Sequence, residues 1–147
     1  MKTYLKLLSV LNILVLCTII SFVSIYFIYD QKFIGIILIG LGILCLVSLK
    51  LFSTKISLTY PDVIFGIIDN GILAIMAVIG AEFAGIIGAI LGGVVGNAIT
   101  DGIAGIFEGY WAESRPNDHR TILGSAVGKM AGCLFGAGAV LAIVELI

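Results

Sequence analysis

The chain has 147 residues, of which 61% are hydrophobic and only 12% are charged, and its formal net charge is −1. Soluble domains are about 45–50% apolar and about 25% charged, so this composition excludes an ordinary soluble protein and indicates an integral membrane protein. The nearly balanced charge, without a long basic or acidic run, gives no sign of a nucleic-acid partner.

Five apolar stretches come close to or exceed the roughly 20 residues that a membrane-spanning helix needs. They are Leu7–Tyr29, Phe33–Leu51, Asp62 to about Gly80, Gly85 to about Trp111, and Ile122–Ile147. The first is too long for the apolar region of a signal peptide, and no small-residue cleavage site closes it, so we expect a retained helix. The sequence therefore predicts an all-α, polytopic membrane protein with five transmembrane helices.

The basic residues predict how these helices are oriented. If five helices alternate in direction, one side of the membrane receives Lys2, Lys6, Lys50, Lys55, Arg115 and Arg120, and only Lys32 falls on the other side. The positive-inside rule then places the N-terminus in the cytosol and the C-terminus outside. The host membrane is either a prokaryotic inner membrane or an organelle membrane.

The chain divides into two parts of different residue composition. Residues 1–58 hold two helices rich in Leu, Ile, Val and Phe, as expected of lipid-facing anchors, whereas residues 59–147 form a three-helix core rich in acids and glycines. Two rows of glycines recur at a spacing of four: Gly88, Gly92 and Gly96, then Gly124, Gly128, Gly132 and Gly136. Lipid offers no hydrophobic drive for helix association, so such rows indicate that the last two helices pack closely, within one chain or between chains. A glycine-lined pore is the alternative.

The sequence contains no cysteine pattern typical of metal binding and no motif typical of an enzyme. Cys17, Cys45 and Cys133 lie in apolar runs without CxxC or Cys/His spacing, so we expect small apolar residues that face lipid or the core. No Ser/His/Asp set, phosphate-binding glycine loop or HExxH motif is present, and we predict no enzymatic activity.

Acidic side chains interrupt the core at regular spacing. Asp62 and Asp69 are seven residues apart, which in a helix places them within about 20° around the axis and about 10 Å along it. By the same arithmetic Asn97, Asp101 and Glu108 form one polar stripe on the next helix. A charge at the bilayer centre costs about 2.5–3.5 kcal/mol on insertion scales, so such residues normally face a bundle interior and mark a pathway.

Carboxylate and amide oxygens suit divalent cations such as Mg²⁺, Mn²⁺ and Fe²⁺, and carboxylates also carry protons. Asp62 and Glu108 should lie near the cytosolic surface, with Asp69, Asn97 and Asp101 deeper. We therefore expect these five residues to form the metal site. The alternative is that the acids are protonated or hydrogen-bonded and serve only in packing.

Three further polar residues carry weaker signals. Glu82, in the predicted break at 80–85, is expected to be solvated on the outer side. Lys129 either pairs with an acid or extends to the cytosolic interface. His119 lies in a polar loop, where we expect it to be solvated, with a role in receiving the metal as the alternative.

Residues 61–119 resemble the first two membrane helices of the vacuolar iron transporter family. The matching features are Asp62 and Asp69, Asn97, Asp101–Gly102, Gly109–Tyr110 and Asp118–His119. The resemblance implies a homodimeric exchanger of Fe²⁺ or Mn²⁺ for protons, with acids of the helix that starts at Asp62 lining the path in both subunits. The chain differs from the family in having Gly105 where Met is common, no acidic helical domain, and one following helix instead of three.

Together these features predict a proton-coupled transporter of a divalent cation such as Fe²⁺ or Mn²⁺, with the metal as substrate and no organic cofactor. Asp62 and Glu108 would form the cytosolic mouth, and Asp69, Asn97 and Asp101 the dehydrating site. We expect a homodimer in the lipid bilayer, with the helix that starts at Asp62 near the two-fold axis. Two alternatives remain: a glycine-zipper assembly or accessory subunit without transport activity, and a small proton or cation channel.

Overall fold

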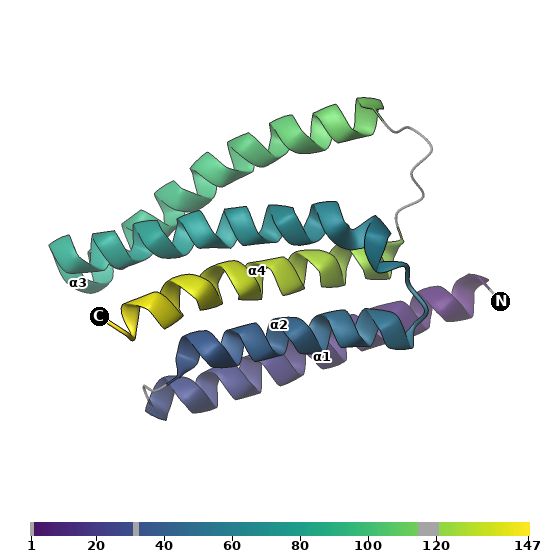
Figure 1. Ribbon diagram of the computed structural model, residues 1–147, viewed down its shortest axis with the longest axis horizontal. Helices are drawn as coiled ribbons and strands as arrows, with labels where there is room; N and C mark the ends of the chain where they lie inside the picture. The colour runs from purple at the N-terminus through teal and green to yellow at the C-terminus, as the bar shows by residue number, and fades with distance from the viewer. Residues whose placement is uncertain (1, 31–32, 115–120) are drawn as a thin grey trace.

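The computed structural model describes residues 2–30, 33–114 and 121–147. Four helices cover most of them: α1 (Lys2–Asp30), α2 (Ile34–Leu51), α3 (Ile56–Ser114) and α4 (Ile122–Val144) (Figure 1). Each holds a segment long and apolar enough to cross a membrane, namely Lys6–Phe27, Ile34–Leu51, Ile56–Phe107 and Ile122–Val144. The predicted all-α class is confirmed for these residues, and the four helices fit a membrane protein.

Helix α3 folds back on itself at Ala84 and Gly85, which leave helical geometry (Figure 1). Gly85 has φ 59° and ψ −138°, a conformation open to glycine because it lacks a Cβ atom. The break predicted between residues 80 and 85 is therefore present. We call residues 56–83 the first arm of α3 and residues 86–114 its second arm.

The start of α3 differs from the prediction. The helix begins at Ile56, six residues before the expected start at Asp62, and it includes Pro61. Pro61 is the sixth residue of α3 and has no N–H to bond to the carbonyl of residue 57, and the helix continues through it.

Both glycine rows pack against the first arm of α3. A side chain added at Gly88 or Gly92 would collide with the backbone of Gly80 or Met76, and one added at Gly96 would lie 2.9 Å from the Leu73 Cα. The second row lies on α4. Side chains added at Gly132 and Gly136 would collide with the backbone of the first arm at Val63 and Ile67. The rows therefore mark close packing inside one chain, and each row meets the first arm of α3.

Helix α2 runs antiparallel to α4 and packs on another of its faces. Its residue Gly35 approaches Gly138 and Ala142 of α4, and Gly42 lies against the ring of Phe135. The apolar core lies between these helices and α1, and consists of Leu16, Cys45, Leu49, Leu123, Val127 and Ala131. Helix α1 buries only 6% of its apolar segment, as expected of a lipid-facing anchor. A cross-helix hydrogen bond from Asn12 Nδ2 to Ser48 Oγ, 2.8 Å long, joins it to α2.

Several lysines lie together at one end of the molecule. The start of α1, the turn between α2 and α3, and the start of α4 lie at one end of the molecule, which we call the basic end because it carries Lys6, Lys50 and Lys55. The C-terminus and the bend of α3 lie at the other end, with Glu82 and Glu145. Arg115 and Arg120, part of the orientation argument, lie outside the described residues.

Candidate functional site

Asp62 lies on the first arm of α3 where it faces α4. Its side chain is 2% exposed, and the Ser125 hydroxyl of α4 donates a hydrogen bond to Oδ1 at 3.1 Å. The close approach of α4 explains the burial, because a Cβ added at Gly128 would lie 3.1 Å from the Asp62 Cβ. Asp62 therefore lies in the α3–α4 interface.

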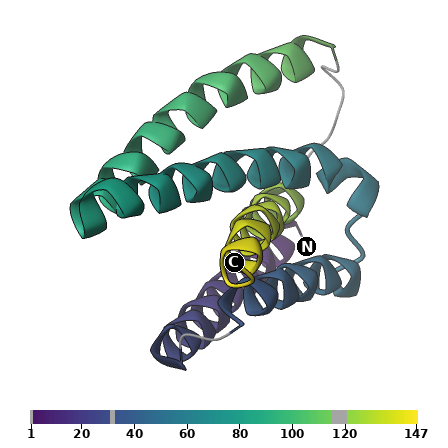
Figure 2. The same ribbon diagram turned by 60° about the vertical axis from the view of Figure 1, so that its left-hand side comes forward.

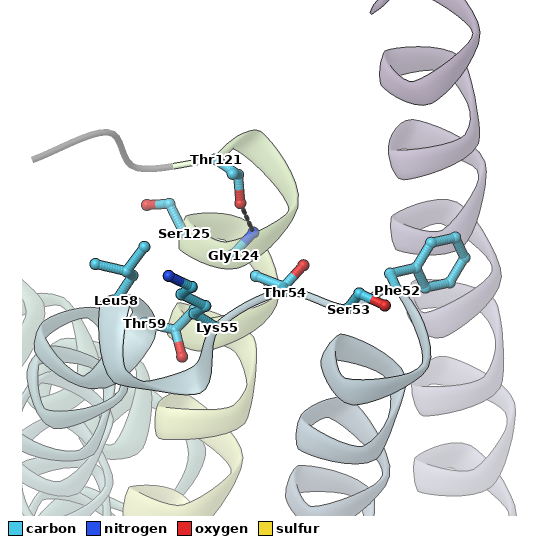
Figure 3. Close-up of a pocket in the computed structure, with 9 residues that line it drawn as sticks. All are labelled: Phe52, Ser53, Thr54, Lys55, Leu58, Thr59, Thr121, Gly124 and Ser125. Carbon is cyan, nitrogen blue, oxygen red and sulfur yellow. Dashed lines mark hydrogen bonds between the residues drawn. The ribbon is translucent and has the colours of Figure 1, made fainter.

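A pocket of about 260 Å³ opens beside this interface at the basic end (Figure 3). It is lined by Phe52, Ser53, Thr54, Lys55, Leu58, Thr59, Thr121, Gly124 and Ser125. Thr121 also caps α4 by accepting a bond from the Gly124 N–H at 3.0 Å, as a residue before a helix N-terminus commonly does. Because Ser125 both lines the pocket and bonds to Asp62, its hydroxyl connects the pocket with the buried carboxylate.

Asp69 lies two turns further along the first arm, where three helical segments meet. Its Oδ1 accepts a hydrogen bond from the hydroxyl of Thr100, a residue of the second arm that is 1% exposed. Its Oδ2 accepts a bond from the Asn70 amide at 3.2 Å, and the same amide nitrogen lies 2.7 Å from the Cys133 sulfur of α4. Asp69 is thus connected to the second arm directly and to α4 through Asn70.

Asn97 and Asp101 flank Thr100 on the second arm. The Asn97 amide donates to Asp101 Oδ2 at 2.9 Å, and the Asp101 side chain is exposed. Between residues 101 and 107 only Ala104 is buried, and added side chains at Gly102 and Gly105 would meet nothing within 4 Å. Figures 1 and 2 show the second arm leading away from the first in this region. We call the place where the arms part the fork, and define it by Asp69, Asn97, Thr100 and Asp101.

The five residues predicted as a metal site are therefore divided by the structure. Asp69, Asn97 and Asp101 gather around Thr100 at the fork, whereas Asp62 lies apart from them against α4. The side chain of Glu108 lies outside the described residues, as does His119. Among the side chains that the structure describes, no three His, Cys, Asp or Glu come together in a way that could hold a metal ion.

Sequence reasoning missed the neutral side chains that connect the acids. Thr100 and Ser125 carry no charge and have no spacing that sets them apart from other hydroxyl residues, although each lies on a glycine-rich helix near a polar residue. Cys45, in the core, and Cys17, exposed on α1, fit the prediction for cysteines. Cys133 does not, because its sulfur accepts a hydrogen bond from a polar amide.

Glu82 and Lys129, the other polar residues considered above, lie away from the fork acids. Glu82 is exposed beside the bend of α3, as expected. Lys129 is half-buried on α4, with its Nζ 5.0 Å from the centroid of the Phe65 ring, a distance at which a cation is attracted to the ring face.

Comparison of the chain with known protein families, with curated proteins and with solved structures finds no match. The resemblance to vacuolar iron transporters therefore stays a prediction from the residues quoted for it. The function is therefore inferred from the positions of the fork residues.

Proposed function

We propose that the protein is a membrane transporter that exchanges a divalent cation such as Fe²⁺ or Mn²⁺ for protons at the fork. The observation that carries the proposal is the position of Asp69, where both arms of α3 and α4 meet, next to the Asn97–Asp101 pair. Carboxylates inside a membrane are expensive and typically mark ion or proton pathways. Packing alone would be served by apolar residues at lower cost.

The lengths of the two arms support a proposal of five crossings of the bilayer. The first arm has roughly 28 residues and would be about 42 Å long at 1.5 Å per residue, and the second arm is of similar length. A hydrocarbon core is about 30 Å thick, so each arm is long enough to cross it, with the bend at the surface. The basic end would then face the cytosol by the positive-inside rule.

The fork supplies the chemistry that such an exchange needs. Oxygens of Asp69, Asp101, Asn97 and Thr100 can replace part of the water shell of a divalent cation. Binding requires ionised carboxylates, so the metal displaces protons and its affinity falls as the pH falls. Asp62, buried against α4 and bonded to Ser125, would hold α4 to the first arm and would not form the mouth.

A homodimer remains part of the proposal, and it is now supported by the exposed second arm instead of by the glycine rows. The glycine rows are occupied inside the chain and give no argument for a second copy. The exposed Asp101, beside the open positions at Gly102 and Gly105, does give one, because a carboxylate inside the bilayer needs protein or water around it. The two-fold axis would then lie near the second arm.

One observation favours a structural role for the acids. The fork carboxylates, Asp69 and Asp101, accept hydrogen bonds from residues of the same chain, as does Asp62. The bonds from Thr100 to Asp69 and from Ser125 to Asp62 join different helical segments, and bonds between membrane helices stabilise packing by about 0.6 kcal/mol on average. The second candidate is therefore an assembly or accessory protein in which the acids only join helices.

Metal uptake into proteoliposomes distinguishes the two candidates. The wild type is reconstituted with a pH-sensitive dye inside, Mn²⁺ is added outside, and metal and proton fluxes are followed together. Asp69→Asn and Asp101→Asn keep an oxygen acceptor but remove the charge, so the fold should persist while flux falls at least tenfold, about 1.4 kcal/mol in barrier height. Glu82→Gln is the matched control, because it removes one exposed charge beside the bend.

We expect Glu82→Gln to behave as the wild type. If the wild type carries neither metal nor protons, or if both fork variants carry them unchanged, the transport proposal fails and the structural role replaces it. Proton flux that needs no metal would instead indicate a channel.

A further inference from the structure

The Asn70 amide nitrogen lies between two groups that bind cations. It donates to Asp69 Oδ2 at 3.2 Å and to Cys133 Sγ at 2.7 Å. A carboxylate oxygen and a sulfur therefore converge on one positively polarised N–H₂ group. A carboxylate oxygen and a cysteine sulfur are also the atoms that commonly bind Zn²⁺ in proteins.

Three helical segments supply this place. Asp69 and Asn70 come from the first arm, Thr100 from the second arm, and Cys133 from α4. Cys133 is half-buried, and the α4 backbone there lies unusually close to the first arm, since a Cβ added at Gly66 would be 2.7 Å from the Cys133 nitrogen. The sulfur is thus held beside the fork by the glycine packing of α3 on α4.

We infer that Cys133 is a ligand of the transported cation, so that the fork selects thiophilic divalent cations such as Fe²⁺, Zn²⁺ or Cd²⁺ over Mg²⁺ and Ca²⁺. This inference rests on the proposed function, because it assumes that the cation stops at Asp69. Thiolate ligands favour Zn²⁺ and iron, whereas sites of carboxylate, carbonyl and water alone suit Mg²⁺, Ca²⁺ and Mn²⁺. One sulfur among oxygens shifts the preference toward the softer ions.

The amide of Asn70 provides a way to open the site. A half-turn of the amide exchanges its nitrogen for Oδ1, which replaces a donor by a third ligand atom. Asp69, Asn70 and Cys133 with one water then complete the four ligands that Zn²⁺ prefers. When the metal binds, the S–H bond breaks, a sulfur–metal bond forms, and the thiol proton leaves to water. A site with only two strong ligands releases its ion readily, as transport requires.

Binding of Cd²⁺ to the purified full-length protein in detergent tests the inference. A bond between Cd²⁺ and a thiolate produces an ultraviolet charge-transfer band. The reference protein carries Cys17→Ser and Cys45→Ala, which leave Cys133 as its one cysteine. We expect this protein to show the band, Cys133→Ser to lose it, and Asp69→Asn to weaken Cd²⁺ binding at least tenfold. Zn²⁺ should remove the band in competition, and a hundredfold excess of Mg²⁺ should not.

A second measurement guards against a variant that folds poorly. Alkylation of Cys133 in the reference protein is timed with and without Cd²⁺, and we expect Cd²⁺ to slow it at least tenfold, with the protection lost in Asp69→Asn. A band that persists without Cys133, or protection that is independent of Asp69, would overturn the inference. If Cd²⁺ binds as expected but vesicles show no flux, the site stands and transport fails. If vesicles carry Mn²⁺ while Cd²⁺ binding does not involve Cys133, transport stands and this ligand is wrong.

Discussion

The contact between the first arm of α3 and α4 can be tested at Gly66, which lies on the first arm opposite the α4 glycines. In Gly66→Ala, the added Cβ would lie 2.6 Å from the Lys129 carbonyl oxygen, 2.7 Å from the Cys133 nitrogen and 2.9 Å from the Gly132 carbonyl carbon. All three are backbone atoms of one helix, so no side-chain rotation relieves the collision. The helices must separate or tilt locally.

The size of that shift sets the expected cost. Ordinary contact begins near 3.4 Å, so the helices must part by roughly 0.8 Å at this point. A gap of about 0.5–1 Å forfeits a quarter to a half of the attraction between each pair of touching atoms. Overpacking of a close-packed interface costs about 1–3 kcal/mol, and the higher helix propensity of alanine offsets at most about 1 kcal/mol of it. We expect a net loss of about 1–2 kcal/mol.

The matched control is Gly40→Ala on α2, where an added Cβ meets nothing within 4 Å. We expect it to be neutral or to stabilise the protein by up to about 1 kcal/mol. Unfolding by sodium dodecyl sulfate in mixed micelles can be followed with a thiol-reactive dye, because Cys45 is 0% exposed in the folded protein. Cys17→Ser and Cys133→Ser remove the other two thiols. If Gly66→Ala and Gly40→Ala unfold within 0.5 kcal/mol of each other, a modest difference for any mutation, the α3–α4 contact described above is wrong.

Two further changes test other parts of the structure. Glu145 Oε1 accepts bonds from the N–H groups of Ile34 and Gly35 at 2.7 and 3.3 Å. Glu145→Ala should therefore lower the free energy of unfolding by about 1 kcal/mol, and Glu145→Gln by less. Hydrogen exchange of the amides at the start of α2 measures the effect. An unchanged exchange rate in Glu145→Ala would show that the carboxylate does not cap α2. Gly105→Ala meets open space within the chain, so a loss of more than about 1 kcal/mol, or a change in oligomer size on light scattering, would place a second copy against the second arm. Unchanged stability and size would count against an interface at Gly105.

Local properties of the sequence were enough to predict the helical elements. A helix satisfies every backbone polar group within its own segment, so apolar runs of about the length of a bilayer predicted helices, and the predicted end of α2 at Leu51 is correct. The bend at residues 84 and 85 was also predictable, because a glycine-containing segment interrupts the apolar run there. The early start of α3 was not, because residues 53–61 are polar and the apolar run begins only after them.

The composition and order of residues by themselves determined that the described chain is helical and that the long apolar segment breaks near residues 84 and 85. These properties depend on chain-local hydrophobicity and backbone freedom. Only the tertiary structure decided that both glycine rows meet the first arm of α3, that Asp62 lies apart from Asp69, and that Cys133 lies near Asp69. Each of these three features depends on which helices pack together and on how each helix is rotated about its axis. With small residues on several faces of the first arm, periodicity along one helix cannot tell which face meets which partner.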